Sequence, residues 1–215
     1  MAQRRLKTVL SAFLRSLQDS RELASDAHQW STTGVAGTGV TITVARKNLL
    51  TEQAFLRSFL AWETFLEEAF LLYLMGQRPP RGRAPFRFTF PPSHKMAMEW
   101  VVPEGRDYAR WTNAQEVSAR AARFFREGKP FSPALNGNQN VLWEMRTLRN
   151  AVAHSSISTQ EKFEKVVRDK IGTYPANLTV GGFLSATVPH SAPPVSYLDS
   201  YLDKLENAAR QIVRM

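Results

Sequence analysis

Cysteine is absent from the 215 residues of this chain. The absence excludes a disulfide framework, catalysis by a thiolate and any zinc site with cysteine ligands. Long uncharged hydrophobic runs are also missing. The most apolar stretch, residues 59–75, carries three glutamates and therefore predicts a buried amphipathic helix instead of a membrane span. Because the N-terminus does not follow the pattern of a signal peptide either, we expect a cytoplasmic protein without a membrane partner.

Acidic residues are scarce relative to basic ones. The chain has 19 Asp and Glu against 28 Lys and Arg, for a formal net charge of +9 and a pI near 10.2. This balance favours polyanionic partners, either nucleic acid or an anionic membrane face. The alternative is an ordinary basic protein whose arginines are simply solvated. His28, His94 and His190 have no companions at metal-ligand spacing, so we expect neither a metal nor another cofactor.

Most of the chain has the periodicity of amphipathic α-helices. Apolar residues recur at steps of three and four over 4–30 and over 47–76, where they cover more than one face. Further helices are predicted over 113–125 or 126, from 137–139 through about 152, over 158–171 and over 196–214. Three of them open on capping pairs, which are Asn113–Glu116, Ser158–Glu161 and Ser196–Asp199. We therefore expect an all-α fold, a helical bundle in a single domain of residues 1–215.

Two segments between the helices are predicted to be irregular. Residues 31–43 are rich in Gly, Thr and Ser and lead into a strand-like run at 40–44, which predicts a flexible connection or a short hairpin. The glycines do not precede Lys-Ser or Lys-Thr, so they do not form a P-loop. Residues 172–194 are mixed, with a possible strand at 178–180.

Residues 77–111 are the longest interruption and are interpreted as an insertion between helices. Within it, residues 86–90 alternate with a period of two, which predicts a short strand or an extended segment. Phenylalanines alternate there with basic residues, of which Arg81, Arg83 and Arg87 are our candidate RNA-binding residues. Such arginines can neutralise phosphates while the aromatic rings stack on bases. The alternative is that the phenylalanines are core and the arginines solubilise the loop. A basic stripe on the next helix adds Arg120, Arg123 and Arg126.

The helix that begins at 137–139 carries an arginine and a histidine near its end, Arg149 and His154. Histidine titrates near neutral pH and can move the proton of a ribose 2′-OH or of the leaving 5′-oxygen. Arginine stays charged and can hold a phosphate and its developing negative charge. The two residue types therefore suit RNA cleavage without a metal, by internal transesterification to a 2′,3′-cyclic phosphate and a 5′-hydroxyl.

Spacing by itself is weak support, since Arg21 and His28 also form a pair on the first helix and are interpreted as coincidental. On a regular helix, the five-residue offset between Arg149 and His154 places their side chains about 140° apart. One segment of this kind cannot close a compact site alone, but two copies meeting across a two-fold axis can.

The segment from Arg149 to His154 resembles the signature of the HEPN superfamily, in which Arg precedes a polar residue and His follows after four to six intervening residues. Asn150 stands in the polar position, and residues 61–70 are similar to an acidic and aromatic helix of some standalone HEPN proteins. The resemblance implies a helical bundle that forms a homodimer with one composite RNase site at its interface. Many members of the family are toxins or phage-defence effectors, so an antitoxin or regulatory protein is a further expected partner.

The candidate catalytic residues are therefore Arg149, Asn150 and His154, with Arg146 and Ser155 as further RNA contacts. Each has a structural alternative. His154 can cap the C-terminus of its helix, Asn150 can cap a neighbouring group, and Arg146 can be a solvated base.

The function that we expect from the sequence is a metal-independent endoribonuclease with RNA as substrate. The alternative is a non-catalytic helical module that binds RNA or a partner protein. A helical DNA-binding regulator is a weaker possibility, because no helix-turn-helix with a recognition helix is evident.

Overall fold

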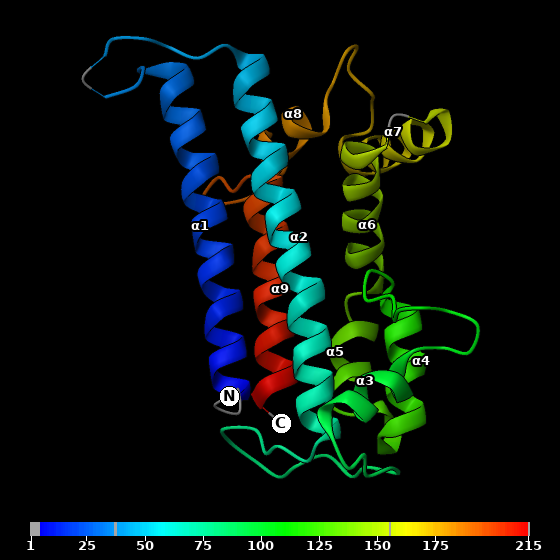
Figure 1. The fold of residues 1–215 in the computed structure, drawn as a ribbon. Coiled ribbons are helices and arrows are strands. Elements are labelled where there is room, and N and C mark those ends of the chain that lie inside the picture. The colour runs from blue at the N-terminus through cyan, green and yellow to red at the C-terminus, as the bar shows by residue number, and fades with distance from the viewer. Residues whose placement is uncertain (1–4, 37, 155, 215) are drawn as a thin grey trace. The chain divides into compact units, whose positions relative to one another are not determined.

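A computed structural model describes residues 5–36, 38–154 and 156–214, and within these ranges it contains helices but no β-strand. The all-α prediction is therefore confirmed (Figure 1). The elements are α1 (Leu6–Thr32), α2 (Val44–Leu74), α3 (His94–Val101), α4 (Ala114–Phe124), the 3-10 turn η1 (Arg126–Gly128), α5 (Phe131–Asn136), α6 (Gln139–Ala153), α7 (Ile157–Ile171), α8 (Val180–Ser185) and α9 (Tyr197–Arg214).

The described residues divide into two compact units. Unit 1 takes in residues 5–14, 61–143 and 204–214, and unit 2 takes in the described residues of 15–60 and 144–203. Each unit combines segments that are distant in sequence. The expectation that the whole chain is a single domain stays a prediction.

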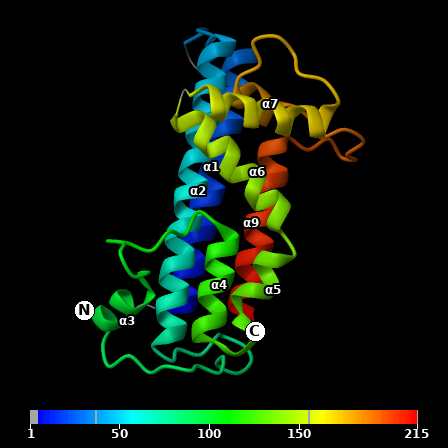
Figure 2. The same ribbon diagram turned by 90° about the vertical axis from the view of Figure 1, so that its right-hand side faces the viewer.

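The core of unit 1 is an aromatic cluster on the second half of α2. The ring of Phe70 lies 5.0 Å from that of Phe131, 5.1 Å from that of Phe125 and 5.4 Å from that of Trp111. These contacts pack α2 against α4 and α5; in Figure 2, α4 runs beside α2 and α5 lies next to α4. Tyr73 is also buried there, and its hydroxyl donates a hydrogen bond of 2.8 Å to the carbonyl oxygen of Ile212 in α9. Burial raises the pKa of Tyr73, so this hydroxyl keeps its proton.

The insertion over 77–111 belongs to unit 1 and is less irregular than its prolines indicate. It contains α3, whose N-terminus is capped by the side chain of Ser93. The short strand expected over 86–90 is not formed, and the segment is extended with one antiparallel bridge, Arg87 to Phe125. Two backbone hydrogen bonds of 3.0 Å flank this bridge, from Phe88 to Phe124 and from Arg126 to Phe86. The alternation therefore corresponds to an extended segment paired at one point.

Unit 2 is built around a second aromatic cluster. Phe183 of α8 stacks on Tyr197 of α9 at 4.4 Å and lies 6.2 Å from Phe163 of α7. The possible strand at 178–180 is wrong, because the side chain of Thr179 accepts a hydrogen bond from the backbone of Gly182 and caps α8.

Several predicted helix ends agree with the structure. Asn113 caps α4, and Ser196 accepts a hydrogen bond of 3.0 Å from the backbone N–H of Asp199 at the start of α9. The cap of α7 is Ser156, two residues before the predicted Ser158. The strand-like run at 40–44 is not a strand either: its last residue opens α2, and Val35 and Val40 close a turn through a 2.8 Å backbone hydrogen bond.

The length and polarity of the helices determine whether any of them could span a membrane. Although α2 is the most apolar of the long helices, glutamates interrupt its sequence. In the described ranges, every helix is too short or too polar to cross a membrane.

Gly181 in unit 2 allows α8 to approach α2 closely. Its backbone N–H donates a hydrogen bond of 2.8 Å to Glu52. A Cβ atom on Gly181 would collide with the backbone carbonyl of Asn48, whereas one on Gly182 would meet mainly side-chain atoms that can move.

We predict that Gly181→Ala destabilises unit 2 by about 1–3 kcal/mol, as overpacking against a fixed backbone does. Gly182→Ala is the matched control and is expected to be neutral or stabilising by up to about 1 kcal/mol, because alanine favours helix. Urea unfolding followed by circular dichroism measures both. Equal stabilities of the two variants would contradict the close approach.

Candidate functional site

The predicted motif lies at the C-terminal end of α6, in unit 2. Met145 and Leu148 are fully buried and hold this part of α6 against the core. Arg149 and Asn150 are half-buried, and His154, the residue after α6, is exposed. The backbone N–H of His154 still donates a 2.9 Å hydrogen bond to the carbonyl of Asn150. Helical geometry therefore reaches His154, and the angular separation of about 140° from Arg149 applies.

Three of the predicted site residues share one face of α6. Arg146, Asn150 and His154 follow each other at four-residue steps, so each is turned by only about 40° from the one before. Arg149 is linked to this row by its neighbour: its guanidinium Nη1 donates a hydrogen bond of 3.3 Å to the Asn150 side-chain oxygen. Asn150 is thus the residue that connects Arg149 to the face that carries His154.

The turn after α6 is fastened by hydrogen bonds. The hydroxyl of Thr159 donates to the carbonyl oxygens of His154 and Ser156, at 2.8 Å each. From this turn α7 runs crosswise to α6 (Figure 2). Its first residue, Ile157, is 81% exposed, so an apolar side chain stands in solvent close to His154 in the sequence. Ser155, a predicted RNA contact, lies outside the described residues.

Glu144, near the middle of α6, anchors this helix to the rest of unit 2. Its carboxylate pairs with Lys170 of α7 at 2.9 Å and accepts a hydrogen bond of 3.1 Å from the hydroxyl of Tyr201 in α9. Only 13% of the Glu144 side chain is exposed. Burial, and then the carboxylate of Glu144, raise the pKa of Tyr201, so its hydroxyl stays a donor. Glu144 was not predicted as a site residue, because its role is to position α6.

A second Arg–His pair lies elsewhere in unit 2. Arg21 and His28, interpreted from the sequence as coincidental, both line a cavity of about 370 Å³ together with Ser185 and Asp199. Their seven-residue offset puts them on one face of α1. Arg21 is engaged in an ion pair of 2.7 Å with Asp203. The acidic residues at and beside this cavity make it a poorer phosphate site than the row of Arg146, Asn150 and His154, in which Arg146 and Asn150 are half-buried and His154 is exposed.

The arginines of the insertion, in unit 1, have different environments. Arg81 and Arg83 are exposed, and Arg83 lines a cavity of about 310 Å³. Arg87 is directed inward: its guanidinium donates a 2.7 Å hydrogen bond to the carbonyl of Leu74 at the end of α2. The same guanidinium covers Gly76, where a Cβ atom would collide with it. Arg87 therefore has a structural role as the cap of α2, and its RNA-binding role stays a prediction.

The basic stripe expected on α4 is only partly exposed. Arg123 and Arg126 are exposed, but Arg120 is 5% exposed and lies over the ring of Trp111 at 4.6 Å. Burial lowers the pKa of Arg120. Its guanidinium also donates to the carbonyl of Arg110 at 3.2 Å, so it serves the core of unit 1. The periodicity of the sequence could not distinguish this buried arginine from its exposed neighbours.

No protein-family model, curated protein or solved structure matches this chain. The HEPN resemblance therefore depends on the motif residues themselves. In the part of the chain that the structure describes, no three His, Asp or Glu side chains are grouped so that they could hold a metal ion.

We predict that Glu144→Ala destabilises unit 2 by about 2–3 kcal/mol, because it removes a charged hydrogen bond and leaves the Tyr201 hydroxyl buried without its acceptor. Tyr201→Phe should cost less, because it leaves no buried hydroxyl without an acceptor and Glu144 keeps its ion pair with Lys170. Glu161→Ala, at an exposed glutamate of α7, is the control and should change stability by less than about 0.5 kcal/mol. Denaturant unfolding measures the three variants. Equal effects of Glu144→Ala and Glu161→Ala would refute the anchoring role.

Proposed function

We propose that this protein is an endoribonuclease that cleaves RNA without a metal, by attack of the ribose 2′-OH on the adjacent phosphate. The observation that carries the proposal is the row of Arg146, Asn150 and His154 on α6, to which Asn150 links Arg149. In keeping with the HEPN resemblance, we place the enzyme among toxins or phage-defence effectors, under the control of an antitoxin or regulatory protein.

The proposed reaction needs two proton transfers and stabilisation of charge. The 2′-oxygen loses its proton and forms a bond to phosphorus, and the bond from phosphorus to the 5′-oxygen breaks. The leaving oxygen gains a proton, so the products are a 2′,3′-cyclic phosphate and a 5′-hydroxyl. His154 is exposed, and its imidazole can accept the 2′-OH proton and then donate a proton to the leaving 5′-oxygen, as histidine does in general acid–base catalysis.

The cations of the motif would bind the phosphate on which negative charge develops. A guanidinium can donate two parallel hydrogen bonds to phosphate oxygens and remains charged throughout. Arg149 is already oriented by its hydrogen bond to Asn150, which lowers the entropy lost when substrate binds. Arg146, one turn before Asn150 on the same face, is placed to contact a neighbouring phosphate of the strand.

We further propose that the complete site needs two copies of the chain. Arg149 and His154 lie about 140° apart around a regular helix, so their positions on one chain do not by themselves bring the guanidinium and the imidazole onto one phosphate. A two-fold axis beside the motif would bring Arg149 of one chain toward His154 of its partner. The exposed Ile157 gives this end of α7 an apolar group that such an interface would bury.

We predict that His154→Ala lowers the rate of RNA cleavage in EDTA by about 10²–10⁴-fold, the usual contribution of a general acid or base. Arg149→Ala should lower it by about 10²–10³-fold through the loss of charge stabilisation. Single-turnover cleavage of a labelled RNA, with analysis of the product ends for cyclic phosphate, measures both.

His28→Ala is the matched control, because His28 is also an exposed histidine with an arginine on its own helix. It should cleave like the wild type. If His28→Ala abolishes cleavage and His154→Ala does not, the active site is the cavity of Arg21 and the proposal is wrong. If the wild-type protein binds RNA in a salt-sensitive way but yields no cleavage product, the result would support the alternative, a non-catalytic RNA-binding module.

We predict that mixing the inactive Arg149→Ala and His154→Ala proteins restores cleavage. If each site combines Arg149 of one chain with His154 of the other, a mixed dimer has one intact site. Random pairing then gives about a quarter of the wild-type activity. The measurement is a cleavage assay after co-refolding or prolonged mixing, with each variant alone as control. Activity of the mixture no greater than the sum of the two separate variants would exclude a site shared in this way.

A further inference from the structure

Three phenylalanines of the insertion are held in solvent on unit 1. Phe86, Phe88 and Phe90 are 55%, 52% and 69% exposed. They alternate with Arg87, whose side chain is directed inward to the end of α2. In an extended segment the side chains of alternate residues leave on opposite faces, so the inward arginine places Phe86 and Phe88 outward. Phe90 follows a bend at Phe88, and its exposed ring has the Arg87 guanidinium 4.8 Å from its centre. We call these three rings the aromatic ledge.

The aromatic ledge has a defined geometry. Backbone hydrogen bonds at Phe86 and Phe88 tie the segment to Arg126 and to Phe124, the last residue of α4. The rings of Phe86 and Phe88 meet edge to face, with their centroids 5.7 Å apart. Exposed rings held by a fixed backbone can receive a flat ligand with little loss of conformational entropy.

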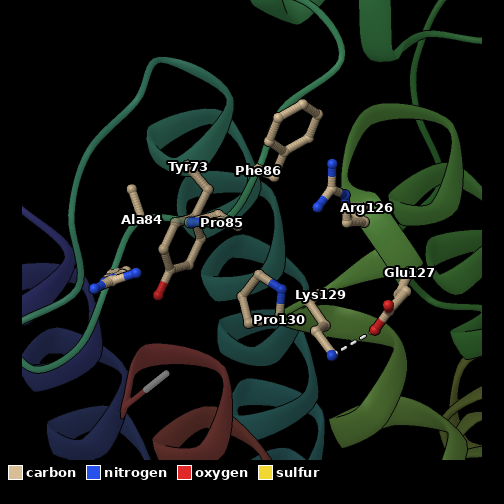
Figure 3. A pocket seen from close by; sticks show the side chains of 9 residues that line it. Tyr73, Ala84, Pro85, Phe86, Arg126, Glu127, Lys129 and Pro130 are labelled. Atoms are coloured by element: carbon tan, nitrogen blue, oxygen red, sulfur yellow. Dashed lines mark ion pairs between the residues drawn. The ribbon is translucent and has the colours of Figure 1, made fainter.

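Cationic side chains lie beside the aromatic ledge. The guanidinium of Arg126 lies over the ring of Phe86 at 4.2 Å, and Figure 3 shows the two side chains next to each other among the residues that line a pocket. Arg83 and Lys129 line the same cavity of about 310 Å³, where Lys129 is paired with Glu127. Aromatic faces and positive charges therefore alternate over a short stretch of surface.

This combination has a preferred class of ligand. A single strand of nucleic acid presents flat bases and anionic phosphates in alternation, so rings can stack on bases while arginines neutralise phosphates. A lipid bilayer fits less well, because insertion of Phe86 would carry the guanidinium of Arg126 toward the acyl chains. A duplex also fits less well, since its bases are already stacked on one another.

We propose that the aromatic ledge, together with Arg83 and Arg126, binds single-stranded RNA. Bases stack on Phe86, Phe88 and Phe90, and the two arginines contact the backbone phosphates. The choice of RNA over DNA rests on the proposed function, whereas the preference for single strands follows from the ledge itself. The ledge is thus a substrate-binding surface that belongs to unit 1, outside the catalytic motif.

The test is binding of fluorescein-labelled oligouridine of 20 nucleotides, measured by anisotropy with a His154→Ala protein that does not consume the probe. Phe86→Ala and Phe88→Ala should each weaken binding by about 5- to 150-fold, the range observed for a stacked base. Arg126→Ala should reduce the slope of log affinity against log salt concentration by about 0.7. An RNA duplex of the same length should bind more weakly than the single strand.

Tyr108→Ala is the control, because Tyr108 is a 64% exposed aromatic residue that is not part of the ledge. It should bind like the parent, and all variants should unfold at the parent's temperature. Unchanged affinity of Phe86→Ala and Phe88→Ala, or a duplex bound as tightly as the single strand, would overturn the proposal. So would binding to phosphatidylglycerol vesicles that depends on the ledge phenylalanines.

The outcome separates this proposal from the nuclease itself. Ledge-dependent binding by a wild-type protein that never cleaves RNA supports the ledge and refutes the proposed function. Cleavage that requires His154, with binding independent of the ledge, supports the function and refutes the ledge.

Discussion

The candidate catalytic segment depends on one nearly buried carboxylate. Glu144 lies on α6 shortly before the motif and contacts Lys170 of α7 and Tyr201 of α9 at hydrogen-bonding distances. Burying a carboxylate is unfavourable unless charged and neutral donors satisfy it, and here both kinds of donor are present. Because the two donors come from different helices, the carboxylate is satisfied only when α6 has one particular position in unit 2. The position of α6 in turn fixes where the backbone of Arg149, Asn150 and His154 lies in unit 2.

Within the motif, Asn150 has a structural role that the sequence pattern did not indicate. As a polar residue after an arginine it is part of a family signature. In the structure it accepts a hydrogen bond from Arg149 and lies one turn from both Arg146 and His154 on the helix surface. The half-buried Arg149 is thereby connected to the row that ends at the exposed His154. This arrangement makes Arg146 a stronger candidate phosphate ligand than its sequence context alone indicates, since it shares the face of His154.

The insertion shows how one structural side chain can create a binding surface. Arg87 donates to the carbonyl of Leu74 at the C-terminus of α2, where the helix dipole favours a positive charge. That inward direction puts the alternating phenylalanines on the outside. The sequence left two interpretations of these phenylalanines, as core or as a stacking surface. Their exposure rules out the first, because a core residue would have lost nearly all of its contact with water.

The sequence by itself determined the helical class, most of the helix positions and the caps at Asn113 and Ser196, because capping and amphipathic periodicity are encoded within a few neighbouring residues. It also identified the Arg149–His154 segment and the interleaving of arginine with phenylalanine. Only the tertiary structure decided that residues 86–90 pair at a single bridge, that Arg120 is buried on Trp111 and that Arg87 caps a helix. The physical reason is that burial and pairing depend on partners distant in sequence, here Phe125, Trp111 and Leu74, which local periodicity does not specify.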